Sequence, residues 1–279
     1  MRIGTSVIAA VMAIGVLAGS TGSASATELT VTNPRIVAHF DLAANQTPED
    51  LAIEPDGSAD ISFSEADEAV RVSLDGHLSV LGQLPRGGAC SPSAISLSLG
   101  IARTSDGTVF LVDCTADSNT GVWRIRPGSA PVQIASLPAN GFPNDMALDA
   151  AHGQLYIADS TLATVWRVSV NGGAPVAWVS DASLARTSFL GANGIAVHDG
   201  AVWVSNTDRG TIVRFPIRDD GTPGPVLAVA TGLGQIDNFT FIPGTDIVVA
   251  ALIVANQVVA IHEDGHTQVL LTGADGLSS

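Results

Sequence analysis

Carboxylate and amide side chains recur along this chain at a nearly regular interval of 44 to 50 residues. They share one position in successive repeats, which reads Glu49, Leu99, Asn144, Asn193 and Asp237. Hard divalent cations prefer such oxygen ligands, and calcium takes about 6–8 of them from carboxylates, amides and water. If the fold gathers the four polar members of this set, we expect them to ligate one divalent cation, with Ca²⁺ preferred. A solvated channel held by hydrogen bonds is the alternative, because Asn-Gly and Asp-Asn pairs are also common in turns.

The strands that would position these residues repeat with them. Each polar position precedes a short first strand, a turn with glycine, and a second strand rich in β-branched and apolar residues. The second strands are expected at Ala59–Phe63, Val109–Val112, Leu155–Ala158, Ala201–Val204 and Ile247–Ala250. Third and fourth strands follow in each repeat, and four strands per unit at this period are typical of β-propeller blades. The sequence therefore predicts an all-β propeller whose polar positions meet at one mouth of the central channel.

A further strand of outer type stands alone before the first repeat. The outer strands of the five repeats are expected at Leu78–Gly82, Val132–Ser136, Pro175–Val179, Val226–Val229 and Thr267–Leu271. Arg35–Phe40 has the same character, and an N-terminal strand often completes the last blade of a propeller. We therefore expect a six-bladed type with five full repeats and an incomplete sixth. A five-bladed ring with Arg35–Phe40 as an extra edge strand is the alternative.

The N-terminal segment is typical of an export signal. Arg2 gives a positive start, and Val7–Gly19 is an apolar run too short to span a bilayer comfortably. Ala24–Ala26 is a small-x-small cleavage site. We expect residues 1–26 to be a signal peptide and residues 27–279 to form one propeller domain. The mature protein would then be secreted, monomeric and without a membrane span; an N-terminal membrane anchor is the alternative.

The composition excludes several kinds of chemistry and of partner. All 12 basic residues are arginine, so Schiff-base catalysis and a phosphate-loop lysine are excluded. The formal net charge of −15 opposes binding to nucleic acid or to anionic lipid. The arginine-only, alanine-rich composition indicates a high-GC bacterial source. Cys90 and Cys114 fall in one repeat, and in an exported protein they are expected to form a disulfide.

Two catalytic patterns are considered and set aside. His262–His266 formally matches H-E-x-x-H, but that zinc-protease pattern requires a helix that places both imidazoles on one face. Here Gly265 and the flanking alternation indicate a hairpin turn instead. The sequence has no G-x-S-x-G, so a serine-hydrolase nucleophile elbow is not expected either.

Three stretches of the chain resemble the senescence marker protein/gluconolactonase family, which includes regucalcin-like lactonases. They are Thr47–Ile53, Gly141–Leu148 with Leu155–Ser160, and Gly191–Val197. The resemblance covers roughly residues 47–271. It implies a six-bladed propeller that holds one divalent metal, often calcium, and hydrolyses lactones and sometimes other esters.

The resemblance also implies roles for single residues. By position it implies metal ligands at Glu49, Asn193 and Asp237, and a general base at Asp237. Asn144 matches a position that contacts the substrate or adds a ligand. Phe142 stands where sugar lactonases of the family carry arginine, and this departure implies a less polar ring substrate.

The ends of the second strands return to the same mouth, so Asp159 and Asn206 join Phe142 and Asn144 as predicted substrate-binding residues. We expect a hydrolase of a small-molecule lactone or ester, in which the metal polarises the carbonyl and Asp237 takes the proton from the attacking water. Two other classes stay open, because propellers carry many functions. One is a non-catalytic secreted propeller that binds a ligand or protein partner at its mouth, and the other is a lyase on the same fold.

Overall fold

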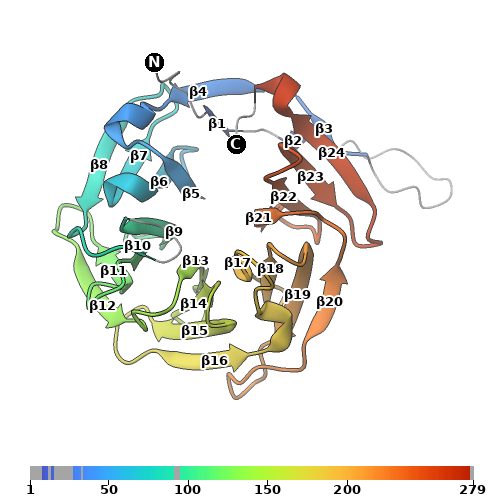
Figure 1. Ribbon diagram of the computed structural model, residues 1–279. Helices are drawn as coiled ribbons and strands as arrows, with labels where there is room; N and C mark the ends of the chain where they lie inside the picture. The colour runs from blue at the N-terminus through green and yellow to red at the C-terminus, as the bar shows by residue number, and fades with distance from the viewer. Residues whose placement is uncertain (1–7, 12–13, 16–27, 33, 91–94, 277–279) are drawn as a thin grey trace.

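The chain folds into five four-stranded antiparallel sheets arranged around a central axis (Figure 1). This computed structural model describes residues 8–11, 14–15, 28–32, 34–90 and 95–276. In the described residues helical structure is limited to 3-10 segments of three residues each. The predicted all-β propeller is therefore confirmed. None of the helices in these described ranges is long and apolar enough to cross a membrane.

Each sheet is one blade, and its strands follow chain order from the axis outward (Figure 1). The innermost strands are β5 (Pro48–Ile53), β9 (Leu97–Arg103), β13 (Pro143–Asp149), β17 (Ala192–His198) and β21 (Ile236–Phe241). The second strands are β6 (Ala59–Phe63), β10 (Val109–Cys114), β14 (Gln154–Asp159), β18 (Ala201–Asn206) and β22 (Val248–Leu252). The third strands are β7 (Glu68–Val72), β11 (Gly121–Ile125), β15 (Thr164–Ser169), β19 (Thr211–Pro216) and β23 (Gln257–Ile261). The outer strands are β8 (Leu78–Gln83), β12 (Val132–Ser136), β16 (Val176–Ser180), β20 (Leu227–Ala230) and β24 (Thr267–Thr272).

The expectation of a six-bladed type with an incomplete sixth blade is wrong for the described residues, which form five four-stranded blades. The lone strand β4 (Arg35–His39) pairs with β1 (Ile8–Val11) in a separate two-stranded sheet. It packs onto blade 1 through Ala38 and Phe40, whose ring contacts Phe63 edge-on at 5.1 Å between centroids. The strand has the apolar alternation of an outer strand because one face is buried on blade 1, and not because it completes a blade.

A second two-stranded sheet joins β2 (Ile14–Gly15) to β3 (Thr30–Val31). Both β1 and β2 come from the segment expected to be a signal peptide, and most of that segment lies outside the described residues. Its cleavage stays a prediction.

Successive blades pack face to face through apolar clusters. Blades 3 and 4 share a cluster in which the Trp178 ring lies edge-on against Tyr156, 4.9 Å between centroids. Similar clusters join blades 1 and 2, blades 2 and 3, and blades 4 and 5. Among the described residues no such cluster joins blade 5 to blade 1, where a cavity lies instead. In blade 2 a disulfide joins Cys90 to Cys114, with Cα atoms 5.4 Å apart.

Candidate functional site

Every innermost strand has an irregularity in its pairing near its N-terminal end. The register against the second strand shifts between Pro48 and Leu51 in β5, and between Ile236 and Phe239 in β21. β9, β13 and β17 shift at equivalent places. A β-bulge places an extra residue in one strand and re-aims the side chains around it. The bulges therefore let two consecutive residues of an inner strand face the channel, where a regular strand would present only one.

The first of these two residues forms an outer ring at the channel mouth. Asn193 donates hydrogen bonds to Asp237 Oδ1 and to Thr207 Oγ1, both at 2.8 Å. The contact with Asp237 joins blade 4 to blade 5. Asn144 donates to Ser160 Oγ at 3.2 Å, and Ser160 in turn donates to the carbonyl of Ala192, next to Asn193.

Glu49 completes the outer ring from blade 1. Enclosure in the channel raises the pKa of its carboxyl well above the usual range, and the charges of Asp50 and Asp237 raise it further. The side chain is nevertheless accessible to water, so it lies in an open channel and not in packed core. Burial also raises the pKa of Asp237, and the hydrogen bond from Asn193 opposes this rise. Three blades thus direct Glu49, Asn193 and Asp237 to one mouth.

The second residue of each bulge forms an inner ring that holds the blades together. Asp50 Oδ2 accepts from the backbone N–H of Ile101 at 2.9 Å, and Asp145 Oδ2 accepts from that of Ile195 at 2.8 Å. Asn238 Nδ2 donates to Asp50 Oδ1 at 3.0 Å, which links blade 5 to blade 1. Sequence reasoning used these residues only as strand starts and missed their part in closing the ring.

Glycine alternates with these polar residues around the inner ring. A Cβ atom on Gly100 would lie 2.5 Å from the Met146 nitrogen and 2.7 Å from Asp145 Oδ1. A Cβ atom on Gly194 would lie 2.7 Å from Asn238 Oδ1. Backbone and side-chain atoms of the next blade occupy this space at both positions, so only glycine fits. The alternation of Asp50, Gly100, Asp145, Gly194 and Asn238 was the sequence signal for this ring.

The chemistry of the outer ring fits a divalent cation. Asn144 Oδ1 is a buried carbonyl oxygen that accepts no hydrogen bond. A buried polar atom without a partner needs an explanation, and a bound ion is one such explanation. A cation would also relieve the repulsion between the Glu49 and Asp237 carboxylates. In the described part of the chain, no three His, Cys, Asp or Glu side chains are grouped so that they could hold a metal. A site here would therefore depend on amide oxygens from Asn144 and Asn193.

Asp159 and Asn206 are fully buried, and protein groups occupy their polar atoms. Asp159 Oδ1 accepts from the backbone N–H groups of Phe142, Thr161 and Leu162 at 2.9–3.0 Å. Asn206 donates to two backbone carbonyls and accepts from the Arg209 N–H. These are the contacts of turn-capping residues, so the geometry does not support a direct role in substrate binding.

Phe142 is also buried, with 5% of its surface exposed. It packs in a cluster with Leu99, Leu190 and the disulfide of Cys90 and Cys114. Its ring therefore belongs to the packing beneath the mouth and does not line an open pocket. Leu99 interrupts the polar ring for the same reason, since blade 2 contributes apolar packing at this position.

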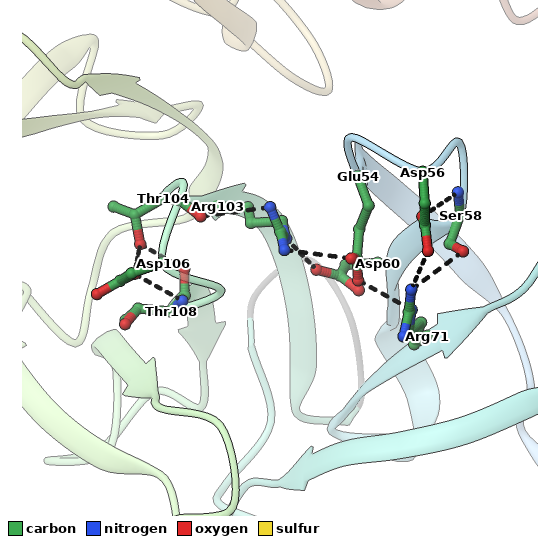
Figure 2. Close-up of polar contacts among 9 residues, drawn as sticks. All are labelled: Glu54, Asp56, Ser58, Asp60, Arg71, Arg103, Thr104, Asp106 and Thr108. Carbon is green, nitrogen blue, oxygen red and sulfur yellow. Dashed lines mark hydrogen bonds and ion pairs between the residues drawn. The ribbon is translucent and has the colours of Figure 1, made fainter.

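Sequence reasoning also missed a partly buried ionic network between blades 1 and 2, in which Asp60 is the buried member (Figure 2). Arg103 contacts Asp60 at 3.1 Å and Glu54 at 3.2 Å, and Glu54 contacts Arg71 at 3.0 Å. Burial and the neighbouring Glu54 carboxylate raise the pKa of Asp60 to about 7. The network lies at the turn end of the inner strands and joins the two blades electrostatically.

Asp113, at the end of β10, is the clearest case of a buried acid whose titration should affect stability. Burial raises its pKa to about 8, although Ser98 donates a hydrogen bond to it. The unfolded chain releases this proton near pH 4, whereas the folded chain retains it up to about pH 8. The contribution of Asp113 to stability therefore falls as pH rises through this window.

We accordingly expect the free energy of unfolding to fall less between pH 5 and pH 8 in Asp113→Asn than in the wild-type protein. The difference should exceed about 1 kcal/mol, because each unit of pKa difference is worth about 1.4 kcal/mol. Urea unfolding at both pH values measures it, with the exposed carboxylate variant Asp220→Asn as control. Parallel pH profiles for all three proteins would contradict the assignment.

Comparisons with known proteins agree with this fold. Neither a family model nor a curated protein matches the sequence. A streptogramin B lyase structure superposes with a TM-score of 0.61 and 15% identity, covering 88% of this chain and 76% of that one. A gluconolactonase from Xanthomonas campestris gives a TM-score of 0.61 and 18% identity, covering 81% of this chain and 76% of that one.

A third match is a catalytically inactive virginiamycin B lyase from Staphylococcus aureus, with quinupristin. Its TM-score is 0.59 with 15% identity, covering 93% of this chain and 88% of that one. At such identities the similarity establishes the propeller fold alone. The chemistry has to be argued from the residues of this chain.

Proposed function

We propose that this protein is a secreted, divalent-metal-dependent hydrolase of lactones or esters whose site lies at the channel mouth. The observation that carries the proposal is the convergence of Glu49, Asn193 and Asp237 from three separate blades on one end of the axis. The buried, unpartnered oxygen of Asn144 supports it. So does the fold, which a gluconolactonase shares.

A divalent cation at this mouth would polarise the lactone carbonyl and lower the pKa of a bound water. Glu49, Asn144, Asn193 and Asp237 are the side chains that would hold it, with calcium favoured by their all-oxygen chemistry. Asp237 is the proposed general base and takes a proton from the attacking water. Its hydrogen bond from Asn193 fixes the carboxylate orientation.

The proposed reaction adds one water to the ring. The water oxygen bonds to the carbonyl carbon, and the bond from that carbon to the ring oxygen breaks. The proton taken by Asp237 returns to the leaving oxygen, which gives a hydroxy acid. The carboxylate is thereby restored for the next turnover.

Metal removal tests this proposal. On a panel of lactones and aryl esters, we expect hydrolysis that a chelator reduces by at least about 100-fold and that added Ca²⁺ restores, since Lewis-acid polarisation is worth several kcal/mol. The rate is measured by pH-stat titration of the acid that ring opening releases. Turnover that is unaffected by chelation would exclude the metal, and no turnover on any member would favour a non-catalytic propeller.

A lyase is the second candidate, because lyase structures cover as much as 93% of this chain with the same fold. The two reactions differ in mass balance. Hydrolysis adds one water to the ring-opened product, whereas elimination opens the ring with no change in mass and leaves a new carbon–carbon double bond. Mass spectrometry of the product therefore separates them.

A further inference from the structure

A cavity of about 960 Å³ separates blade 5 from blade 1. We call it the blade 1–5 slot. One wall is the face of blade 1, with Leu51, Ile53 and Ile61, and the other is the face of blade 5, with Val249, Ala251 and Val258. Figure 1 shows this gap as the widest interval between neighbouring blades, with β4 crossing its outer end. The slot is thus the one interval of the described ring where blade faces do not pack against each other.

The slot is continuous with the channel. Glu49 and Asp50 line its inner end, and Val37 and Ala38 of β4 line its outer end. Along β5 it extends from Glu49 to beyond Ile53, a distance of about 13 Å at a rise of ~3.3 Å per residue. Any group bound beside Glu49 at the mouth can therefore extend directly into the slot.

The walls of the slot are apolar and partly open to water. Leu51 and Ile53 are 47% and 54% exposed, although both are large aliphatic residues on an inner strand. All of its charged lining residues are acids from the two rings, Glu49, Asp50 and Asp145, at its inner end. Large exposed apolar patches of this kind mark binding sites, and the volume falls within the range of small-molecule pockets.

The walls favour a small molecule over a peptide strand as the occupant. An added strand needs an unpaired sheet edge that can supply backbone hydrogen bonds. Here the walls are sheet faces, and the strands that form them are paired within their own blades. What the faces offer is apolar contact area.

We propose that the blade 1–5 slot binds an extended apolar group of the substrate, so that the substrate is a lactone or ester with a long alkyl or comparable apolar substituent. This inference rests on the proposed function, since the reacting carbonyl is placed at the mouth beside Glu49. The substituent leaves the mouth past Glu49 and lies between Ile53 and Val249.

The test uses γ-lactones that differ only in the length of an unbranched alkyl substituent. KM should fall about fourfold for each methylene that enters the slot. Ile53→Arg, which places a charge in the slot, should remove this dependence and should lower kcat/KM at least tenfold more for the longest lactone than for the shortest. Val132→Arg is the matched control, because Val132 lies on an outer strand and is 53% exposed, close to the 54% of Ile53.

Binding of the corresponding long-chain γ-lactam, measured by calorimetry, gives a readout that needs no turnover. Its affinity should fall at least tenfold in Ile53→Arg and stay unchanged in Val132→Arg. Lactones hydrolysed without chain-length dependence would overturn the slot and leave the proposed function standing. Chain-length-dependent lactam binding without any lactone turnover would support the slot and overturn the hydrolase. Equal losses for short and long ligands in Ile53→Arg would also overturn the slot.

Discussion

Replacing Asp237 with asparagine is expected to lower kcat for lactone hydrolysis by about 10²–10⁴-fold, the usual contribution of a positioned general base. Asparagine has nearly the same shape and its carbonyl can still accept the hydrogen bond that Asn193 donates to Asp237. The substitution therefore removes the basic carboxylate while keeping the contact between blades 4 and 5. Initial rates on the best lactone of the panel measure the effect, at saturating metal so that any loss of affinity is compensated.

The control is Asp264→Asn, an exposed carboxylate in the same blade whose contact is to the backbone N–H of His266. We expect this variant to keep the full rate. If Asp237→Asn keeps the rate as well, while its unfolding midpoint is unchanged, the base lies elsewhere and the mechanism is wrong.

Glu49→Gln is expected to lower the affinity for calcium by at least about tenfold, because ligand charge sets the strength of calcium sites. Only Glu49 and Asp237 bring negative charge to the predicted ligand set, so the loss of one halves it. Calorimetric titration of the metal-free protein measures the change. The free energy of calcium binding should change by more than the free energy of unfolding. Glutamine keeps the size of the side chain and one oxygen at the same place, so folding is little affected.

Glu65→Gln provides the comparison, because Glu65 is an exposed glutamate in the same blade. Calcium affinity should be unchanged in that variant. Equal affinities for the unchanged protein and for Glu49→Gln would remove Glu49 from the site.

The blades were predictable because their periodicity is local. The predicted second strands Ala59–Phe63 and Ala201–Val204 coincide with or lie within β6 and β18, since runs of apolar and β-branched residues between turns form strands in any packed sheet. The sixth blade was wrongly inferred from Arg35–Phe40. The alternation of apolar residues in this segment reflects one buried face. Such a pattern does not indicate which sheet, if any, the strand joins.

The channel was predictable only in part. A regular strand turns successive side chains to opposite faces, so only Glu49 and its counterparts were expected at the mouth. The bulges bring Asp50 and Asp145 to the axis as well, and a bulge is a property of pairing between strands that one strand's sequence does not display. Asp159 was placed against the substrate because it lies at the right end of β14, but its oxygens accept backbone and indole N–H groups instead.

A crystal structure of the protein grown with calcium tests the central claim most directly. The account predicts one ion at the channel mouth, with oxygens of Glu49, Asn144, Asn193 and Asp237 among its ligands at about 2.3–2.6 Å. Calcium bound only at surface carboxylates, with the Asn193–Asp237 hydrogen bond intact and the mouth holding water alone, would contradict the metal site and the hydrolase built on it.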